Sequence, residues 1–548
     1  MLDFLKSKKR RKEPQDTKLD RLVTLIVLDG FGVHPDSVGN AVLAAKTPFL
    51  DTAWTYGKST LIHASGTHVG LPNEVAGNSE VGHLNLGAGQ VVYQSLPRIN
   101  EAIQHHELDN NDTIKGMFKH IRDNDSRLHL VGVLSTAGVH GHINHLFSIM
   151  ELCKEKRIDP FIHVILDGRD TPPTEGFFYI SKLKEKMKEL GIGHIASIMG
   201  RYYGMDRDSR WERTKLAYDA MVGISGTRFT DPVQALQDSY NRDVTDQFFI
   251  PAVAIDTVGR IVGKVESNDA ILFWNFREDR ARQLTKVFVL DNWNHFVRRE
   301  YPENVYFVTM TGYEEGLPAK VIFPPKKVNM PIAEYLSSIG VNQLHVSETE
   351  KHMHVTYFFN GGVEELHPGE DNINLPSPRV NDYSLTPAMS APEISRETVR
   401  RIEANGKYNY GFILINFANP DMLGHTGDFR ATVESNEITD KYTADISLAT
   451  LRAGGAVIIT ADHGNCETMI NRQTGEVDIA HTNNPVPLSI IENINQVNGK
   501  DGRDLVKIGT GDSAKVTGIL ADVAPTCLST MGLDIPTSMT GMDLNTVI

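Results

Sequence analysis

The stretch VTLIVLDG (23–30) decides the fold class, because it is a short, β-branched apolar run that ends in a charged residue. Comparable runs recur along the chain at 128–136, 161–170, 195–201, 270–277, 305–312, 409–417 and 455–464. Each run is too short for a buried helix and has the composition of a strand covered on both faces. Amphipathic stretches such as 176–190 and 393–405 predict crossover helices. This alternation indicates an α/β fold built on mostly parallel, doubly wound sheets.

Length and composition bound the number of domains and the class of protein. A chain of 548 residues predicts two to four domains, and 40% hydrophobic with 23% charged residues is a globular composition. No apolar run approaches the roughly 18 residues that span a bilayer, so we expect no membrane span. Two proline-containing segments, Tyr93–Pro97 after a glycine-rich stretch and Phe323–Lys327, mark candidate domain boundaries.

The charge distribution excludes some partners. Lys and Arg number 55 against 69 Asp and Glu, and six of the basic residues lie within residues 1–12, so the body is strongly acidic. This argues against nucleic-acid binding but leaves anionic substrates open, because local arginines or metal ions reverse the field inside a cleft. The basic N-terminus lacks the apolar core of a secretory signal. We expect residues 1–17 to be a disordered basic tail, with attachment to an anionic surface as the alternative.

The three cysteines, Cys153, Cys466 and Cys527, have no paired short spacing. A zinc ribbon or disulfide framework is therefore not expected. This cysteine usage fits a reducing compartment, so the predicted location is cytoplasmic.

Charged or polar side chains follow one predicted strand after another. They are Asp29, His140, Arg169 with Asp170, Arg201, Arg277, Asp421, and Asp462 with His463. Parallel sheets bind ligands at the carboxyl ends of their strands, so these residues predict a site there. The alternative is that polar residues simply end strands, as in any loop.

Carboxylates and imidazoles in glycine- or proline-rich turns predict a metal centre. In NPDMLGH (419–425), a helix would place Asp421 and His425 on one face. The adjacent pair in TADHGN (460–465) either serves one ion through a bent loop or faces two. The full set of candidate ligands is Asp29, Asp421, His425, Asp462, His463 and His481. Oxygen and imidazole ligands without thiolate suit Mn²⁺, Zn²⁺, Co²⁺ or Fe²⁺.

The candidate nucleophile is Ser79 in AGNSEVGH (76–83). The small residues before it suggest a strained turn that presents the hydroxyl beside a metal ion, which would activate a weak nucleophile. The alternative is an ordinary turn and helix cap. The chain has no GxSxG nucleophile elbow, so acyl transfer is disfavoured.

Taken together, these motifs resemble those of the cofactor-independent phosphoglycerate mutases, members of the alkaline-phosphatase superfamily. The resemblance spans about residues 21–548, in the family order LDGFG, GNSEVGH, GVHGH, LDGRD, GRYYGMDRD, NFREDR, SETEKHMHVTYFFNGG, NFANPDMLGHTG, TADHGN and AHTNNPVP. It implies interconversion of 3-phosphoglycerate and 2-phosphoglycerate through a phosphoserine on Ser79, without bisphosphoglycerate.

The resemblance also implies two divalent metal ions and a split domain. One ion would be held by Asp421, His425 and His481, and the other by Asp29, Ser79, Asp462 and His463. Mn²⁺ is the expected metal, with Zn²⁺ or Co²⁺ as alternatives. Residues 18–92 and 326–548 would form the phosphatase-like metal domain, and 93–325 an inserted substrate-binding domain that closes to exclude water.

The substrate-binding residues implied by the resemblance are His140, Arg169, Asp170, Arg201, Arg207, Arg277, Arg280 and Lys351. Guanidinium groups match the carboxylate and phosphate of phosphoglycerate, although any one arginine alone is also compatible with a surface ion pair. Asp170 is our candidate for moving protons among glycerate hydroxyls, and Lys351 for neutralising the transferring phosphoryl group. The expected partner is this small molecule alone, and the expected state is a monomer.

The chain departs from the family pattern near His140. Thr136 and Ala137 replace the usual acid and glycine, and Gly141 replaces a serine, so the shape of that loop is an open question. Two rival readings are a metal-dependent phosphatase or phosphopentomutase of the same superfamily, and a non-catalytic metal-dependent sensor or scaffold.

Overall fold

The computed structural model describes residues 19–325, 327–500 and 504–548, which form two compact units. The first unit comprises the described residues up to Gln94 and from Lys327 onward, and the second begins at Ser95. The breaks therefore fall within the two segments that the sequence marks as boundaries. The basic tail predicted at residues 1–17 lies outside the described residues. Among the described residues, no helix has the length and apolar character needed to cross a membrane.

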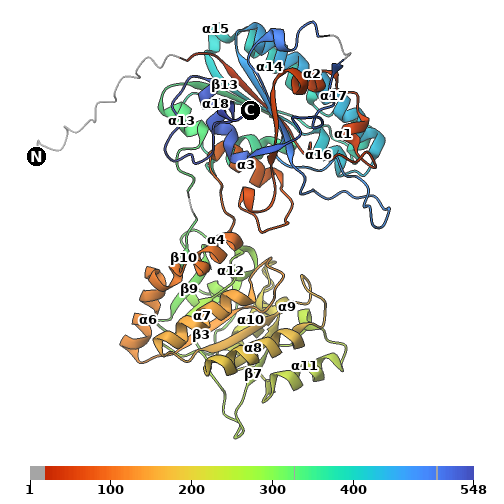
Figure 1. Ribbon diagram of the computed structural model, residues 1–548. Coiled ribbons are helices and arrows are strands. Elements are labelled where there is room, and N and C mark those ends of the chain that lie inside the picture. The colour runs from red at the N-terminus through yellow and green to blue at the C-terminus, as the bar shows by residue number, and fades with distance from the viewer. Residues whose placement is uncertain (1–18, 326, 501–503) are drawn as a thin grey trace, which may run out of the picture. The chain divides into compact units, whose positions relative to one another are not determined.

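The first unit is built on one sheet (Figure 1). Its strands among the described residues are β1 (Val23–Leu28), β2 (Lys58–His63), β11 (Asn342–Glu348), β12 (Glu370–Leu375), β13 (Tyr410–Phe417), β14 (Ala456–Thr460), β15 (Val486–Ile491) and β16 (Val516–Ile519). Their spatial order is β12-β11-β13-β1-β14-β15-β2-β16. Only β15 runs antiparallel to its neighbours. Segments that precede and follow the second unit in the sequence both contribute strands to this sheet.

Strand β1 lies inside the sheet between β13 and β14, and every one of its residues is buried. It pairs in parallel with β13 and with β14, so that Leu28 lies opposite Phe417 and Val27 opposite Thr460. The carboxyl ends of these three strands consequently meet at one edge of the sheet. The loops that begin there carry the predicted metal ligands.

The helices of the first unit among the described residues are α1 (Ala41–Ala44), α2 (Pro48–Tyr56), α3 (Ser79–Ala88), α13 (Ile332–Ser338), α14 (Ala391–Glu403), α15 (Asn405–Tyr408), α16 (Asn419–Gly424), α17 (Phe429–Arg452) and α18 (Val523–Thr530). Both α17 and α18 pack on β1, which is why that strand needs no polar face.

The second unit has its own sheet, in the order β10-β9-β8-β3-β4-β5-β7-β6. Its strands are β3 (Leu128–Val133), β4 (Phe161–Leu166), β5 (His194–Gly200), β6 (Arg228–Phe229), β7 (Ala252–Ala254), β8 (Ala270–Phe273), β9 (Tyr306–Thr311) and β10 (Lys320–Phe323). All pairs are parallel except β5 with β7. All eight strands predicted from apolar runs are confirmed across the two sheets, and so is the α/β class.

The helices of the second unit among the described residues are α4 (Ser95–Gln104), α5 (Glu107–Asn110), α6 (Asp112–Asn124), α7 (Ile143–Lys156), α8 (Gly176–Leu190), α9 (Arg201–Gly204), α10 (Trp211–Met221), α11 (Pro232–Tyr240) and α12 (Glu278–Val289). The predicted crossover helix at 176–190 is confirmed as α8. Neighbouring strands β8, β3, β4 and β5 precede the loops that carry the predicted arginines and His140.

Candidate active site

Ser79 is the first residue of helix α3. The Asn78 side chain accepts a hydrogen bond from the Val81 amide at 2.9 Å, and Asn78 itself is extended with φ −153°. None of residues 76–79 has a positive φ, so the expected strained turn is wrong. The physical reason is that an ordinary Asn-capped helix start already presents the hydroxyl. The amino end of a helix also favours a negatively charged group at this position.

One group of candidate metal ligands surrounds Ser79. Asp29, Asp462 and His463 are fully buried and offer ligand atoms within 4.8 Å of one another. The Ser79 hydroxyl donates to Asp29 Oδ1 at 3.0 Å, and its Oγ lies 3.0 Å from His463 Nε2. Asp462 and His463, adjacent in sequence, therefore converge on one group through a bent loop.

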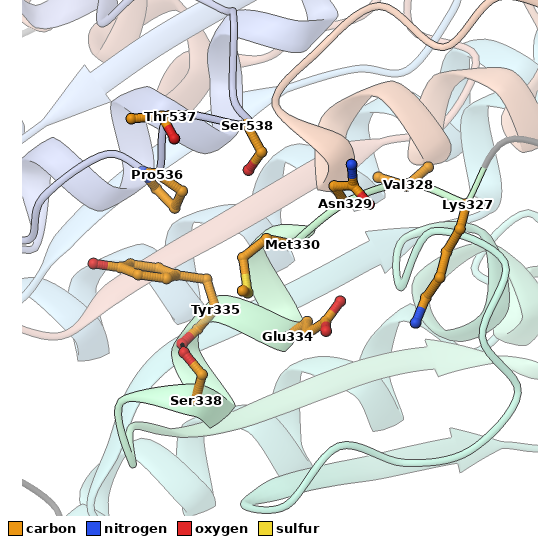
Figure 2. A pocket seen from close by; sticks show the side chains of 10 residues that line it. All are labelled: Lys327, Val328, Asn329, Met330, Glu334, Tyr335, Ser338, Pro536, Thr537 and Ser538. Atoms are coloured by element: carbon orange, nitrogen blue, oxygen red, sulfur yellow. Dashed lines mark hydrogen bonds between the residues drawn. The ribbon is translucent and has the colours of Figure 1, made fainter.

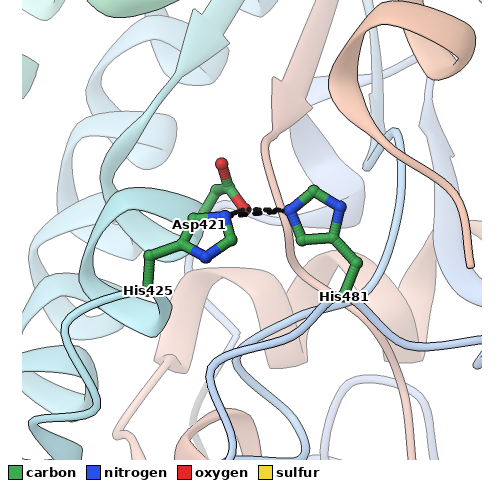
Figure 3. A group of neighbouring side chains, drawn as sticks. All are labelled: Asp421, His425 and His481. Atoms are coloured by element: carbon green, nitrogen blue, oxygen red, sulfur yellow. Dashed lines mark hydrogen bonds and ion pairs between the residues drawn. The ribbon is translucent and has the colours of Figure 1, made fainter. Parts of the chain in front are cut away.

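The second group consists of Asp421, His425 and His481 (Figure 3). Asp421 lies in α16 and His425 directly follows that helix, so the helix predicted for NPDMLGH is confirmed. Both imidazole Nε2 atoms lie 3.3 Å from Asp421 Oδ1, and they lie 2.9 Å from each other. Three ligand atoms thus converge on one small volume.

The tautomers of these histidines follow from their second ring nitrogens. His425 Nδ1 donates to the Ile479 carbonyl oxygen, and His481 Nδ1 donates to the Gly77 carbonyl oxygen, each at 2.9 Å. In the neutral rings, both Nε2 lone pairs then face each other and a carboxylate oxygen. Such an arrangement is repulsive unless a proton or a metal cation lies between the atoms, and it is the orientation that metal-binding histidines adopt.

Lys351 lies between the two groups. Its Nζ donates to Asp29 Oδ1 at 2.7 Å, to Ser79 Oγ at 2.7 Å and to Asp421 Oδ2 at 2.6 Å. Burial alone would lower the pKa of Lys351, but the nearby carboxylates outweigh it and raise that pKa. The ammonium group is therefore charged and touches the hydroxyl of the candidate nucleophile.

The charges of this buried region do not balance. Three buried carboxylates, Asp29, Asp421 and Asp462, are accompanied by two cationic groups, the Lys351 ammonium and a protonated His463, which leaves an excess of one negative charge. Burial would lower the pKa of His463, yet these carboxylates raise it to about 10. A buried site that attracts protons this strongly also suits divalent cations.

Sequence reasoning missed the residues that orient these ligands. Asn416 donates to Asp29 Oδ2 at 2.7 Å, and Asn465 donates to Asp421 Oδ1 at 3.0 Å. His83 Nδ1 donates to the Ser79 carbonyl oxygen at 2.9 Å, and its Nε2 accepts from Asn416 at 3.1 Å. All three lie inside or beside the quoted motifs, so their position next to the candidate ligands was the available signal.

In the second unit, the predicted substrate residues gather at the carboxyl ends of neighbouring strands. Arg201 NH1 donates to Asp167 Oδ1 at 2.5 Å and to Asp170 Oδ2 at 2.6 Å. His140 Nε2 lies 3.8 Å from the same Asp170 oxygen. Asp167 was not predicted, although it stands inside LDGRD.

Asp279 is a second carboxylate of this cluster that the sequence analysis missed, although it lies inside NFREDR. It accepts from Arg207 NH1 at 2.7 Å, and Arg277 Nε lies 3.4 Å from its other oxygen. That oxygen and His140 Nδ1 are buried without a hydrogen-bond partner, 3.6 Å apart. Unsatisfied buried polar atoms at a cluster of cations indicate a place for a polar ligand.

The remaining arginines belong to the same cluster. Burial lowers the pKa of Arg280, and the charges of Arg201, Arg207 and Arg169 lower it further. Burial and the charge of Arg201 also lower the pKa of His140 to about 4. Five guanidinium groups, Arg169, Arg201, Arg207, Arg277 and Arg280, thus outnumber the three carboxylates Asp167, Asp170 and Asp279.

The departures from the family pattern have a local explanation. The Thr136 hydroxyl lies 2.9 Å from the Tyr179 hydroxyl, which ties the His140 loop to α8. A Cβ atom at Gly141 would lie 2.9 Å from Val133 Cγ1 and 3.0 Å from Asn275 Oδ1. A serine would not fit there without a shift, so the loop is packed for glycine.

A separate cavity of about 520 Å³ lies elsewhere in the first unit (Figure 2). Met330, Tyr335 and Pro536 are among its lining residues, and none of the predicted ligands or arginines lines it. The candidate metal ligands and the substrate-binding residues therefore lie outside this cavity.

Comparisons with known proteins agree with the geometry. The family model described as the BPG-independent PGAM N-terminus (iPGM_N) matches residues 99–315. The 2,3-bisphosphoglycerate-independent phosphoglycerate mutase of Acetivibrio thermocellus is 43% identical and covers 96% of this chain and 99% of its own. That of Clostridium tetani is 44% identical, with 95% and 98% covered.

A solved structure of Leishmania mexicana phosphoglycerate mutase at low cobalt concentration superimposes with a TM-score of 0.58 and 32% identity, covering 96% of this chain and 98% of that one. Relatives of this identity, aligned over nearly the whole length, establish the family. The chain belongs to the 2,3-bisphosphoglycerate-independent phosphoglycerate mutases.

Proposed function

We propose that this chain interconverts 3-phosphoglycerate and 2-phosphoglycerate through a phosphoserine on Ser79, using two divalent metal ions and no bisphosphoglycerate. The observation that carries the proposal is the position of the Ser79 hydroxyl. It touches Asp29, His463 and Lys351 at a junction of two ligand groups. A hydroxyl so placed is suited to accept a phosphoryl group and return it.

Two ions fit the ligands on charge and on lone-pair direction. One would be held by Asp421, His425 and His481, and the other by Asp29, Ser79, Asp462 and His463. When bound, such ions supply charge neutralisation to phosphoryl oxygens and lower the pKa of a coordinated hydroxyl. Mn²⁺ is the proposed metal, with Zn²⁺ or Co²⁺ as alternatives. The cobalt in the conditions of the Leishmania structure supports a divalent transition metal.

In the first half-reaction, Ser79 Oγ attacks the substrate phosphorus in line. The phosphorus–oxygen bond to glycerate breaks, the Ser79 hydroxyl loses its proton, and the departing glycerate oxygen takes up a proton. Lys351 Nζ, already 2.7 Å from Oγ, neutralises charge that develops during transfer.

In the second half-reaction, the other glycerate hydroxyl attacks the phosphoserine, and Ser79 leaves as an alkoxide that regains its proton. We propose that Asp170 moves protons between the glycerate oxygens. His140, Arg169, Arg201, Arg207, Arg277 and Arg280 bind the anionic substrate, with Arg277 and Arg280 assigned to its carboxylate. The net positive charge of their cluster supports this role.

The test is to incubate the purified protein with 3-phosphoglycerate and Mn²⁺, without bisphosphoglycerate, and to follow phosphorus NMR signals. The expected result is an equilibrium mixture of the two phosphoglycerates. Inorganic phosphate as the main product would instead identify a phosphatase. Quenched turnover analysed by peptide mass spectrometry should place the phosphoryl group on Ser79, and no adduct at any time point would reject the phosphoserine.

Binding of the metals is tested separately from turnover. Calorimetric titration of the chelator-treated protein with Mn²⁺ should reveal two tight sites. A single site would contradict the assignment of the two ligand groups. The expected monomer is checked by light scattering on the same sample.

A further inference from the structure

Glu467 is a fully buried carboxylate that the proposed mechanism does not use. It lies in a turn just after the ligands Asp462 and His463. Its Oε2 accepts from the backbone amide of Asn465 at 2.8 Å. Its Oε1 accepts from the side chains of Thr482 and Asn484, the latter at 2.8 Å. Within the described residues, no Lys, Arg or His forms an ion pair with it.

These contacts join the loops that supply ligands to both groups. Asn465 follows His463 by two residues, and Thr482 is adjacent to His481. A backbone bridge between Gly464 and Thr482 lies directly beside the carboxylate. Glu467 is therefore a link between the loop that carries Asp462 and His463 and the loop that carries His481.

Two glycines, Gly32 and Gly464, pack directly against the Glu467 carboxylate, where a side chain would clash with it. A Cβ atom at Gly32 would lie 2.4 Å from the Glu467 carboxyl, and one at Gly464 would lie 2.6 Å from Oε1. Gly32 follows the ligand Asp29 by three residues. Segments from three ligand-bearing loops consequently close around one buried side chain.

The hydrogen-bond chemistry requires a carboxylate at this position. An ionised carboxylate only accepts, and here it receives bonds from a backbone amide, a hydroxyl and a side-chain amide. A glutamine would place its NH₂ group either against the Asn465 N–H or against the Asn484 NH₂. Each orientation sets a donor against a donor in a buried place, which is costly.

We propose that Glu467 is a positioning residue that fixes the two metal-ligand loops relative to each other, so that both ions bind tightly. This inference rests on the proposed metal sites. Groups outside the ligand set that orient the ligands typically contribute about 10- to 100-fold to metal affinity. Because Glu467 touches neither a proposed ligand side chain nor a substrate residue, its effect should appear in metal affinity before it appears in chemistry.

The experiment compares Glu467→Gln with wild type by calorimetric titration of Mn²⁺ into chelator-treated protein, without substrate. The expected result is a loss of affinity of about 10- to 100-fold at one or both sites. Turnover should fall steeply at limiting Mn²⁺ and recover most of its wild-type rate at saturating Mn²⁺. Thr482→Val removes the hydroxyl that donates to Glu467 and accepts from the Asn484 amide. It should give a smaller loss in the same direction, and it also tests the proposal if Glu467→Gln does not fold.

Asp440→Asn is the matched control, because Asp440 is also a buried carboxylate that accepts backbone amides, those of Phe49 and Leu50. It should change thermal stability but leave Mn²⁺ affinity unchanged. Wild-type Mn²⁺ affinity in both Glu467→Gln and Thr482→Val would overturn the inference while leaving the proposed function intact. Failure of wild type itself to bind Mn²⁺ would instead overturn the proposed function.

Discussion

The ligand cluster of the first unit and the arginine cluster of the second are opposite in charge and in exposure. Around Ser79, three carboxylates, the Lys351 ammonium and the protonated His463 are almost completely buried and leave an excess of one negative charge. In the second unit, five guanidinium groups face three carboxylates and leave an excess of two positive charges. There, Arg207 and Arg277 retain 45% and 50% side-chain exposure.

The opposite charges indicate which counter-charge each cluster needs. A buried negative excess calls for resident cations, because unpaired charges are costly away from water. A half-exposed positive excess is tolerated in water and is available to a soluble anion. We therefore expect changes in the first cluster to remove turnover or metal binding, and changes in the second to weaken substrate binding.

The largest expected effect is that of Ser79→Ala. Loss of the hydroxyl removes the only proposed phosphoryl acceptor, so kcat should fall by at least about 10⁴-fold. A coupled assay for 2-phosphoglycerate measures this loss. Ser59→Ala, which alters a part-buried hydroxyl in the same sheet, is the control and should retain activity. Substantial turnover in Ser79→Ala would remove the phosphoserine from the mechanism.

Lys351→Met should come next in size. Without the ammonium, the buried carboxylates of Asp29 and Asp421 lose the cation that contacts them both, and breaking such a pairing typically costs about 3–5 kcal/mol. Chemical denaturation of the chelator-treated protein measures this loss of stability. Saturating Mn²⁺ should restore part of the stability but not kcat, since Lys351 also contacts Ser79 Oγ. Wild-type stability without metal would contradict the charge imbalance described for this cluster.

Arg277→Ala should affect binding more than chemistry. Its guanidinium group is half exposed and, among the residues that the structure describes, forms an ion pair with Asp279 alone, so little stability should be lost. Loss of charged hydrogen bonds to a substrate carboxylate should raise KM by about 10- to 100-fold, with a smaller change in kcat. Steady-state kinetics separate the two parameters. Arg260→Ala, at an exposed ion pair of the same unit, should match wild type.

The smallest expected effect is the response of KM to pH. Burial and Arg201 lower the pKa of His140 to about 4, so this ring stays neutral down to about pH 5. Folding stability should fall as pH drops from about 6.5 to about 4, because over that range the unfolded state binds a proton at His140 that the folded state does not. At saturating Mn²⁺, KM should therefore stay flat between about pH 8 and 5.

Metal affinity should behave differently over the same range. The hydrogen bond to Asp421 raises the pKa of His425, so protons compete with metal as pH falls. Mn²⁺ titrations at several pH values should show affinity falling with acidity. If KM for 3-phosphoglycerate, measured at saturating Mn²⁺, rose over the same pH range in which Mn²⁺ affinity falls, the two clusters would not titrate independently.

Some elements were predictable because their signal is local. The runs that form β1, β13 and β14 are apolar, short and bounded by turn residues, and the amphipathic period of 176–190 matches α8. Other strands were missed because their signal is weak. The edge strand β12, with sequence EDNINL, is largely polar and only partly buried, so it has no apolar pattern to find.

The α/β class, the family and the residue types that follow each strand could be predicted from the chain alone, since apolar periodicity and motif order are local properties. The three-dimensional arrangement was needed to place Lys351 between the two ligand groups, to bring Asp279 into the arginine cluster, and to show that Glu467 links the ligand loops. Those relations join residues far apart in the chain, such as Lys351 with Asp29 and Asp421. The physical reason is that strand order and register set such distances, and a linear pattern does not encode them.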